Sequence, residues 1–196
     1  MTAFLFISTL ALLFGSIEVY VALALSSTLA IALFTPIPLE IVAQRMFAGI
    51  DKFSLMAVPF FILAANVMKG GGISYRILNF IQAIVGHKKG GLAATVVLSC
   101  MFFGAVSGSS PATVVAIGGL MYPAMVEAWY GKGFSIGLIT SSSAVAVIIP
   151  PSIGMIVYGS VTGVSVGELF MAGFIPGLVY GLVFILYSYY YAVKND

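Results

Sequence analysis

The sequence is poor in charge and in cysteine, and each shortage excludes a class of protein. Charged residues make up 7% of the 196 positions, whereas soluble domains carry about 25%. So few charges cannot cover a water-facing surface, which excludes a soluble globular enzyme. The net charge of +2 is too small for nucleic-acid binding. The single cysteine, Cys100, lies in an apolar run, which excludes a disulfide within the chain and argues against a cysteine metal site.

Apolar residues dominate the composition. They make up 61% of the chain, which excludes disorder and predicts an all-α, polytopic membrane protein. No basic residue precedes the first apolar run, so we interpret it as membrane-embedded structure and not as a cleaved leader. Residues 3–34 are long for one span and short for two, and Gly15-Ser16 leaves two short helices or one kinked helix open. Glu18 is either a functional charge at membrane depth or a helix-end residue.

Two amphipathic segments flank an apolar segment at 53–68, which Pro59 is expected to kink. Residues 39–50 and 73–84 place apolar side chains at helical spacing with polar ones between them, as in helices that lie in the membrane interface. Residues 69–89 contain no acid and four bases, namely Lys69, Arg76, Lys88 and Lys89. The positive-inside rule therefore places this stretch in the cytoplasm, where we expect His87 to be solvated.

The next apolar segment is interrupted by a short polar turn. Residues 92–106 and 112–126 are apolar, and residues 107–111 separate them. Each arm reaches about 22 Å as a helix, short of a hydrocarbon core about 30 Å thick, which predicts a re-entrant hairpin. The Ser110-Pro111 step predicts that Ser110 caps the second arm.

A second apolar segment is broken by two prolines. A helix is expected over 134–146, and Pro150-Pro151 forbid its continuation before a short helix that begins near residue 153. The freed backbone carbonyls can coordinate a cation, and the positive start of a following helix can face an anion. One such break is compatible with a harmless kink, but a pair of them favours a transporter site. The last apolar segment, residues 169–193, is a plausible full span with Pro176 as a kink, tyrosine anchors near its end and a polar tail at 194–196.

These segments resemble the large membrane subunit of tripartite ATP-independent periplasmic (TRAP) transporters. The motifs that carry the resemblance are Gln44-Arg45-Met46-Phe47-Ala48-Gly49-Ile50-Asp51, Val58-Pro59-Phe60-Phe61-Ile62-Leu63-Ala64, Phe102-Phe103-Gly104-Ala105-Val106-Ser107-Gly108-Ser109-Ser110-Pro111-Ala112-Thr113 and Ile148-Ile149-Pro150-Pro151-Ser152. The resemblance implies an elevator fold of the ion-transporter superfamily. It also implies sodium-coupled secondary uptake of an organic acid, of the C4-dicarboxylate or sialic acid type, across the bacterial inner membrane.

The resemblance also implies partners and an incomplete site. The expected partners are a small four-helix membrane subunit and a periplasmic substrate-binding protein, in contact with membrane lipid. Because the family's large subunit has about twice this length, the chain resembles its first inverted repeat, and a second-repeat half would complete it. The expected divisions are scaffold helices with amphipathic arms at 1–91, a transport domain at 92–166 (hairpin 92–126, broken helix 134–166) and a final transmembrane helix at 167–196.

The resemblance also implies site residues. It implies that sodium, the co-transported ion, binds at the turn and at the break, with the candidates Ser107, Ser109, Ala146, Ile149 and Pro151. The substrate carboxylate is expected at a helix start and a serine run, with the candidates Ser110, Ser141, Ser142 and Ser143. The alternative function is a structural or channel-forming membrane subunit. An intramembrane serine hydrolase is disfavoured because no base accompanies the serines, so we expect no enzymatic activity.

Overall fold

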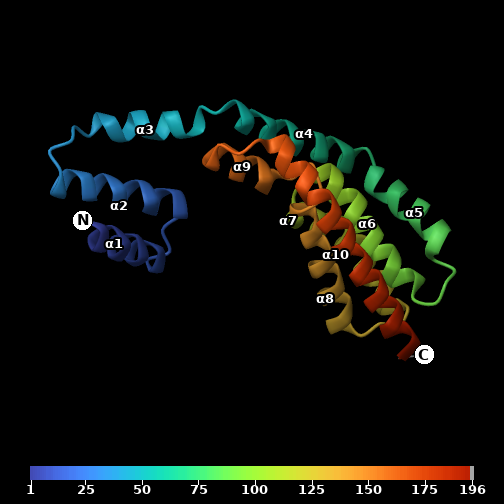
Figure 1. Cartoon of the computed structure of the whole chain (residues 1–196). Helices are drawn as coiled ribbons and strands as arrows, with labels where there is room; N and C mark the ends of the chain where they lie inside the picture. The colour runs from blue at the N-terminus through green and yellow to red at the C-terminus, as the bar shows by residue number, and fades with distance from the viewer. Residues whose placement is uncertain (195–196) are drawn as a thin grey trace. The chain divides into compact units, whose positions relative to one another are not determined.

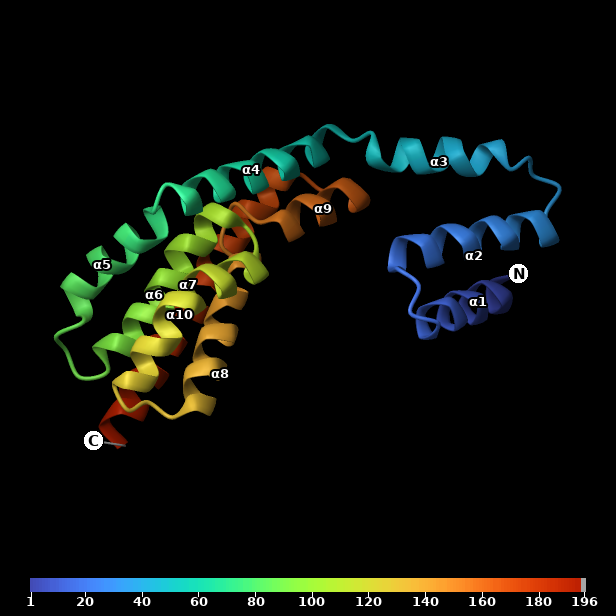
Figure 2. The same cartoon turned by 180° about the vertical axis from the view of Figure 1, so that it is seen from behind.

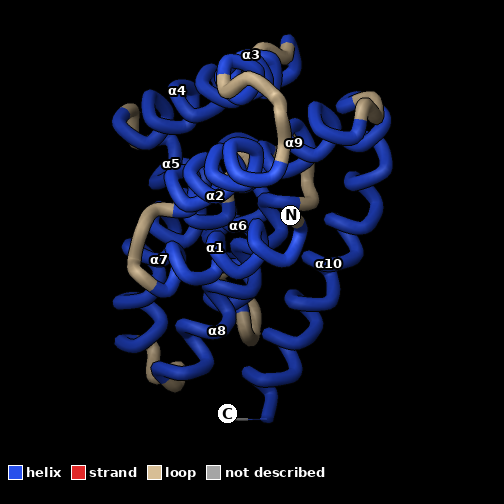
Figure 3. Tube along the Cα trace, turned by 90° about the vertical axis from the view of Figure 1, so that its left-hand side faces the viewer, coloured by secondary structure: helices blue, strands red, loops and turns tan. Residues whose placement is uncertain are grey.

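The computed structural model describes residues 1–194, apart from the side chain of Lys69. Asn195 and Asp196 of the predicted polar tail lie outside the described residues. Throughout those residues the chain is helical, with no strand (Figure 3), which confirms the all-α prediction. The helices divide into two compact units, Met1–Lys52 and Phe53–Asp196, and each is described by itself.

The first unit contains α1 (Thr2–Phe14), α2 (Val19–Phe34) and α3 (Glu40–Ile50). The open question about residues 3–34 is thereby answered in favour of two helices, separated at Gly15-Ser16, where Ser16 has a φ of 61°. The two helices run antiparallel, with Thr9 Oγ1 donating to Ser26 Oγ at 2.8 Å. Glu18 is exposed at the N-cap position of α2, so it occupies a helix end.

The second unit holds the hairpin and the broken helix. Its elements are η1 (Phe53–Met56), α4 (Ala57–Gly70), α5 (Ile73–Val85), α6 (Gly91–Ser107), α7 (Ser110–Glu127), α8 (Lys132–Ser143), η2 (Ala144–Val147), α9 (Ile153–Thr162) and α10 (Val166–Lys194). The predicted hairpin arms correspond to α6 and α7, each one or two residues longer at both ends. Pro59 was expected to kink a helix, but it lies in the first turn of α4, directly after the 3₁₀ helix η1. In the first turn of a helix the missing N–H of proline costs no hydrogen bond.

Helix α6 lies at the centre of this unit, against α5, α7, α8 and α10 (Figures 1 and 2). Its buried side chains point in several directions and include Val96, Val97 and Cys100, as expected for a helix enclosed by neighbours. They share one apolar core with Ile117 of α7 and Leu138 of α8. The core therefore holds the two arms of the hairpin and the first half of the broken helix together.

Within the described residues, only α10 is by itself long and apolar enough to cross a membrane. The stretches Glu40–Ile50 and Phe53–Met68 pass the same test only when they are counted as one span. At 17 residues, α6 reaches about 25 Å, less than the roughly 30 Å of a hydrocarbon core. The first arm of the hairpin is therefore too short to cross such a core as a straight helix, as the sequence predicted.

Candidate functional site

The turn between α6 and α7 is built by serine, threonine and glycine. Gly108 ends α6 with a φ of 61°, a left-handed conformation that glycine adopts without a Cβ penalty. Ser109 has extended backbone and caps α7, its Oγ accepting from the Ala112 N–H at 3.5 Å. The prediction that Ser110 is the cap is therefore wrong by one residue, because Pro111 stands at the second helical position and Ser110 at the first.

The hydroxyl groups of the turn brace one another. Ser107 is 1% exposed, and its Oγ lies 3.1 Å from Thr113 Oγ1. Thr113 Oγ1 in turn donates to the Ser109 carbonyl at 2.9 Å. Thr113 was missed as a site residue by sequence reasoning, although its place one helical turn after Ser109 could have identified it. These contacts fix the direction of the Ser109 carbonyl.

The break between α8 and α9 is equally ordered. After η2 the chain reaches Pro150-Pro151, which have no N–H, so Pro150 cannot donate to the Ala146 carbonyl four residues earlier. Ser152 spans the gap: its Oγ donates to the Val147 carbonyl at 2.7 Å and accepts from the Met155 N–H at 3.3 Å. Ser152 therefore caps α9 and also fixes the end of η2. A serine placed directly after the prolines and before an apolar run is the sequence signal for this role.

The turn and the break are in direct contact. The Ile153 N–H donates to the Gly108 carbonyl at 3.1 Å, and a Cβ built on Gly108 would lie 2.8 Å from the Pro151 carbonyl oxygen. One helical turn earlier, a Cβ on Gly104 would lie 2.8 Å from the Cβ of Ala146. The structure thus joins the turn to the break through Gly108 and through Pro151 and Ala146. Of the other predicted cation ligands, Ser107 and Ser109 flank Gly108, whereas Ile149 packs against Gly177 of α10.

The four predicted substrate serines differ in burial and in hydrogen bonding. Ser110 is half-buried at the start of α7. The Ser143 hydroxyl lies 3.4 Å from Cys100 Sγ on α6, and the Ser141 carbonyl accepts from Tyr180 Oη of α10 at 2.9 Å. These two groups are engaged with neighbouring helices and do not meet Ser110. The Ser142 hydroxyl is buried without a hydrogen-bond partner within the described structure, so its bonding capacity is unused.

Helix α10 packs its glycine face directly on the break. Space for a Cβ is absent at three positions: Gly173 faces the Ile148 carbonyl, Gly177 faces Ile149, and Gly181 faces Met101. Glycines at this spacing let helix backbones approach closely. This contact and the Tyr180 hydrogen bond were both missed by sequence reasoning, and the spacing of four between the glycines was the available signal.

The electrostatics of the site come from the backbone. Residues 91–126 and 133–167 contain no Asp, Glu, His, Lys or Arg, and the described residues contain no cluster of His, Cys, Asp or Glu that could hold a metal ion. Carbonyl and hydroxyl oxygens remain as ligands, which suits a hard monovalent cation. Both α7 and α9 begin at this junction, so two positive helix ends lie beside it.

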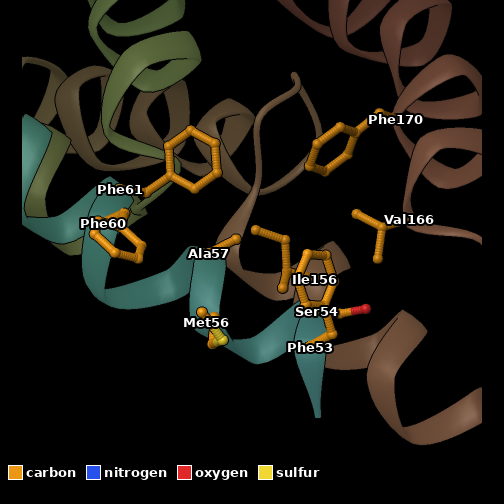
Figure 4. Close-up of a pocket in the computed structure, with 9 residues that line it drawn as sticks. All are labelled: Phe53, Ser54, Met56, Ala57, Phe60, Phe61, Ile156, Val166 and Phe170. Atoms are coloured by element: carbon orange, nitrogen blue, oxygen red, sulfur yellow. The ribbon is translucent and has the colours of Figure 1, made fainter.

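An apolar cavity of about 380 Å³ lies elsewhere in the same unit, between η1, α4, α9 and α10. Figure 4 shows aromatic side chains from α4 and α10 on either side of it, with Phe61 and Phe170 facing the space between them. Ser54 contributes the one hydroxyl among its lining residues. A lining without charge or backbone donors does not fit an organic anion, so this cavity is not the candidate site.

Comparison with known proteins identifies the relatives of this chain. Residues 6–196 match the family described as "Tripartite ATP-independent periplasmic transporter, DctM component". The chain is 50% identical over 155 residues to the ectoine TRAP transporter large permease protein TeaC of Halomonas elongata, covering 79% of this chain and 36% of that protein. It is 44% identical over 195 residues to the C4-dicarboxylate TRAP transporter large permease protein DctM of Vibrio cholerae, covering 98% and 43%.

A third relative is the isethionate TRAP transporter permease protein DctMQ of Oleidesulfovibrio alaskensis, 43% identical over 198 residues, with 97% of this chain and 31% of that protein covered. The chain thus spans less than half the length of the curated relatives it matches.

Proposed function

The chain belongs to the DctM component family of TRAP transporters, and on this premise we propose that it forms part of a large permease that couples sodium entry to uptake of a small organic acid. The observation that carries the proposal is the joined turn and break, where the Ile153 N–H meets the Gly108 carbonyl. Gly108 and Ile153 are 45 residues apart in the chain, and two independent helix kinks would not be expected to contact each other. As a pair they resemble the broken helices that form transporter sites.

The proposed ion site uses backbone oxygens. Sodium would bind between the carbonyls of Ser107–Ser109 and those of Ala146–Pro151, with the bracing hydroxyls of Thr113 and Ser152 holding both segments in place. Because no fixed negative charge lies in these segments, the bound cation would be the main local charge. Its binding would therefore favour an anion beside it.

The substrate is proposed to meet the starts of α7 and α9. A carboxylate there gains from the positive ends of both helices and from their first-turn N–H groups. Ser110 stands at the start of α7 and is the first candidate to bind it, and Ser142 is the second because its hydroxyl has no partner in the described structure. The Ser141 carbonyl and the Ser143 hydroxyl already contact α10 and α6. The relatives are named for ectoine, a C4-dicarboxylate and isethionate. These names support our proposal that the substrate is an organic acid, with the C4-dicarboxylates as the first candidates.

Uptake is proposed to proceed by movement of the site as one body. The hairpin shares one core with the first half of the broken helix, and the glycine face of α10 packs against the break and α6. These elements would move against scaffold helices in a multi-pass subunit of the bacterial inner membrane. A second-repeat half, a small four-helix subunit and a periplasmic binding protein would complete the assembly.

The test is uptake by the full-length permease, reconstituted with its small subunit and binding protein in proteoliposomes, with labelled succinate as the first solute. We expect accumulation when sodium is outside and none when potassium replaces it. Equal uptake in potassium would contradict sodium coupling. Solute flow that never exceeds equilibrium in any gradient would favour the channel alternative.

A further inference from the structure

A closed ring of three hydrogen bonds crosses the turn between α6 and α7, the two arms that lie side by side (Figures 1 and 2). The Ser109 N–H donates to Ser107 Oγ at 3.4 Å, and Ser107 Oγ lies 3.1 Å from Thr113 Oγ1. Thr113 Oγ1 closes the ring by donating to the Ser109 carbonyl at 2.9 Å. Ser107 is the last residue of α6, and Thr113 lies near the start of α7. The ring therefore ties the end of one arm to the start of the other through side chains.

The ring has one direction, because each hydroxyl has a single hydrogen to donate. The Ser109 carbonyl can only accept, and Thr113 Oγ1 lies closer to it, at 2.9 Å, than Ser107 Oγ does, at 3.4 Å. Thr113 therefore supplies the hydrogen for this carbonyl, and Ser107 supplies the hydrogen between the two hydroxyls. Thr113 is thus the acceptor that orients the Ser107 side chain and also the donor that orients the Ser109 carbonyl.

The same ring distinguishes the two candidate carbonyls of the turn. The Ser109 carbonyl already accepts twice from Thr113, from its N–H at 3.1 Å and from its hydroxyl at 2.9 Å, and these two bonds use both lone pairs of the oxygen. The Ser107 carbonyl lacks its helical donor, because Pro111 stands four residues later and has no N–H. The Ser107 carbonyl is therefore the one with bonding capacity for a cation, and its direction depends on where the ring holds Ser107.

We infer that Thr113 is a positioning residue that sets the affinity of the turn for sodium by holding Ser107 in place. This inference rests on the proposed function and deepens it, since it concerns the same ion site. The Thr113 side chain is 0% exposed and its hydrogen is directed at the Ser109 carbonyl, so it acts through Ser107 and does not meet the transported solute. Its replacement is expected to change sodium binding at the turn.

A second threonine of the hairpin provides a matched comparison. Thr95 of α6 is also 0% exposed, and its Oγ1 donates to the carbonyl four residues earlier, that of Gly91, at 2.7 Å. It stands 12 residues before Ser107, which is about 18 Å along a helix. Thr95 and Thr113 therefore share residue type, burial and local hydrogen bond, and they differ in that Thr113 also meets Ser107.

The experiment measures sodium binding to the full-length permease as the sodium-dependent rise in its unfolding midpoint. Sodium chloride is titrated against potassium chloride at constant total salt, so no solute has to be chosen. We expect Thr113→Val to raise the half-saturating sodium concentration about tenfold, which corresponds to about 1.4 kcal/mol and to the net contribution of about one hydrogen bond. Thr113→Ser keeps the hydroxyl and should restore the half-saturation of the parent. Thr95→Val should leave it unchanged even where it lowers the midpoint itself.

A second variant tests the same ring without depending on how Thr113→Val folds. Ser107→Ala removes the hydroxyl but keeps the carbonyl, and it should raise the half-saturating sodium concentration as well. Because both side chains belong to one ring, the double variant should be no weaker in sodium binding than the weaker single variant. Effects that multiply in the double variant would overturn the inference.

The remaining outcomes separate this inference from the proposed function. An unchanged half-saturation in Thr113→Val, or an equal rise in Thr95→Val, would overturn the role of Thr113 and leave the ion site standing. A parent permease that sodium and potassium stabilise equally would contradict the ion site itself, and the role of Thr113 with it.

Discussion

Removal of the Tyr180 hydroxyl is expected to weaken sodium binding without disrupting the fold. This group donates to the Ser141 carbonyl at 2.9 Å, two residues before the end of α8, and so connects α10 to the segment that precedes the break. In Tyr180→Phe the ring and its packing on Phe184, at 4.8 Å between centroids, remain. The Ser141 carbonyl also keeps the backbone N–H of Ala144 as a donor, so no buried acceptor is left unsatisfied.

The magnitude follows from that single lost bond. A hydrogen bond whose acceptor stays satisfied contributes about 0.5–1 kcal/mol. If that energy holds the carbonyls of the break in their binding geometry, its loss raises the half-saturating sodium concentration about two- to fivefold. The maximal rate of uptake should stay close to that of the parent, because the substrate groups at the start of α7 are untouched.

The assay is sodium titration of succinate uptake by the full-length transporter in proteoliposomes. The matched control is Tyr187→Phe, which removes a hydroxyl from the same helix where its ring contacts Phe134 at 6.1 Å, far from the break. An unchanged sodium dependence in Tyr180→Phe would refute the reasoning. An equal shift in Tyr187→Phe would refute it as well, since the effect would then not depend on the break.

Three further predictions concern the turn and the break. Gly108→Ala should abolish or strongly reduce uptake. A left-handed alanine costs about 1–2 kcal/mol, and its Cβ would lie 2.8 Å from the Pro151 carbonyl oxygen. The control is Gly137→Ala, whose Cβ would meet nothing within 4 Å and which should leave uptake intact. Ser152→Ala removes the cap of α9 and should lower the free energy of unfolding by about 1 kcal/mol, measured by thermal unfolding; an unchanged midpoint would count against the bridging role of its hydroxyl. Ser109→Ala should destabilise the protein by a similar amount and Ser110→Ala by less, and the reverse order in the same measurement would restore the original cap assignment.

The sequence predicted the interruptions well because the residues that make them act locally. Glycine frees φ and proline removes a donor wherever they stand, so the breaks at 107–111 and at Pro150-Pro151 could be read without knowing any neighbour. The cap was misplaced by one residue for a related reason. Serine before proline is the commoner start of a helix, but here Ser109 has the extended backbone of a cap, and two serines side by side give the sequence no means to choose.

Contacts between distant elements could not be predicted in the same way. Tyr180 and Ser141 are 39 residues apart, and neither residue type indicates the other. The glycines of α10 were visible at a spacing of four, but their role depends on which helix lies opposite, and the sequence does not specify that they face Ile148 and Ile149.

The central claim is that the turn and the break form one cation site, and hydrogen–deuterium exchange of the full-length transporter tests it most directly. Peptides covering residues 107–113 and 146–153 would be followed in sodium and in an equal concentration of potassium. The account predicts that sodium protects both peptides together, with half-protection at the same sodium concentration, and that potassium protects neither. Protection of only one peptide, or equal protection in both salts, would contradict it.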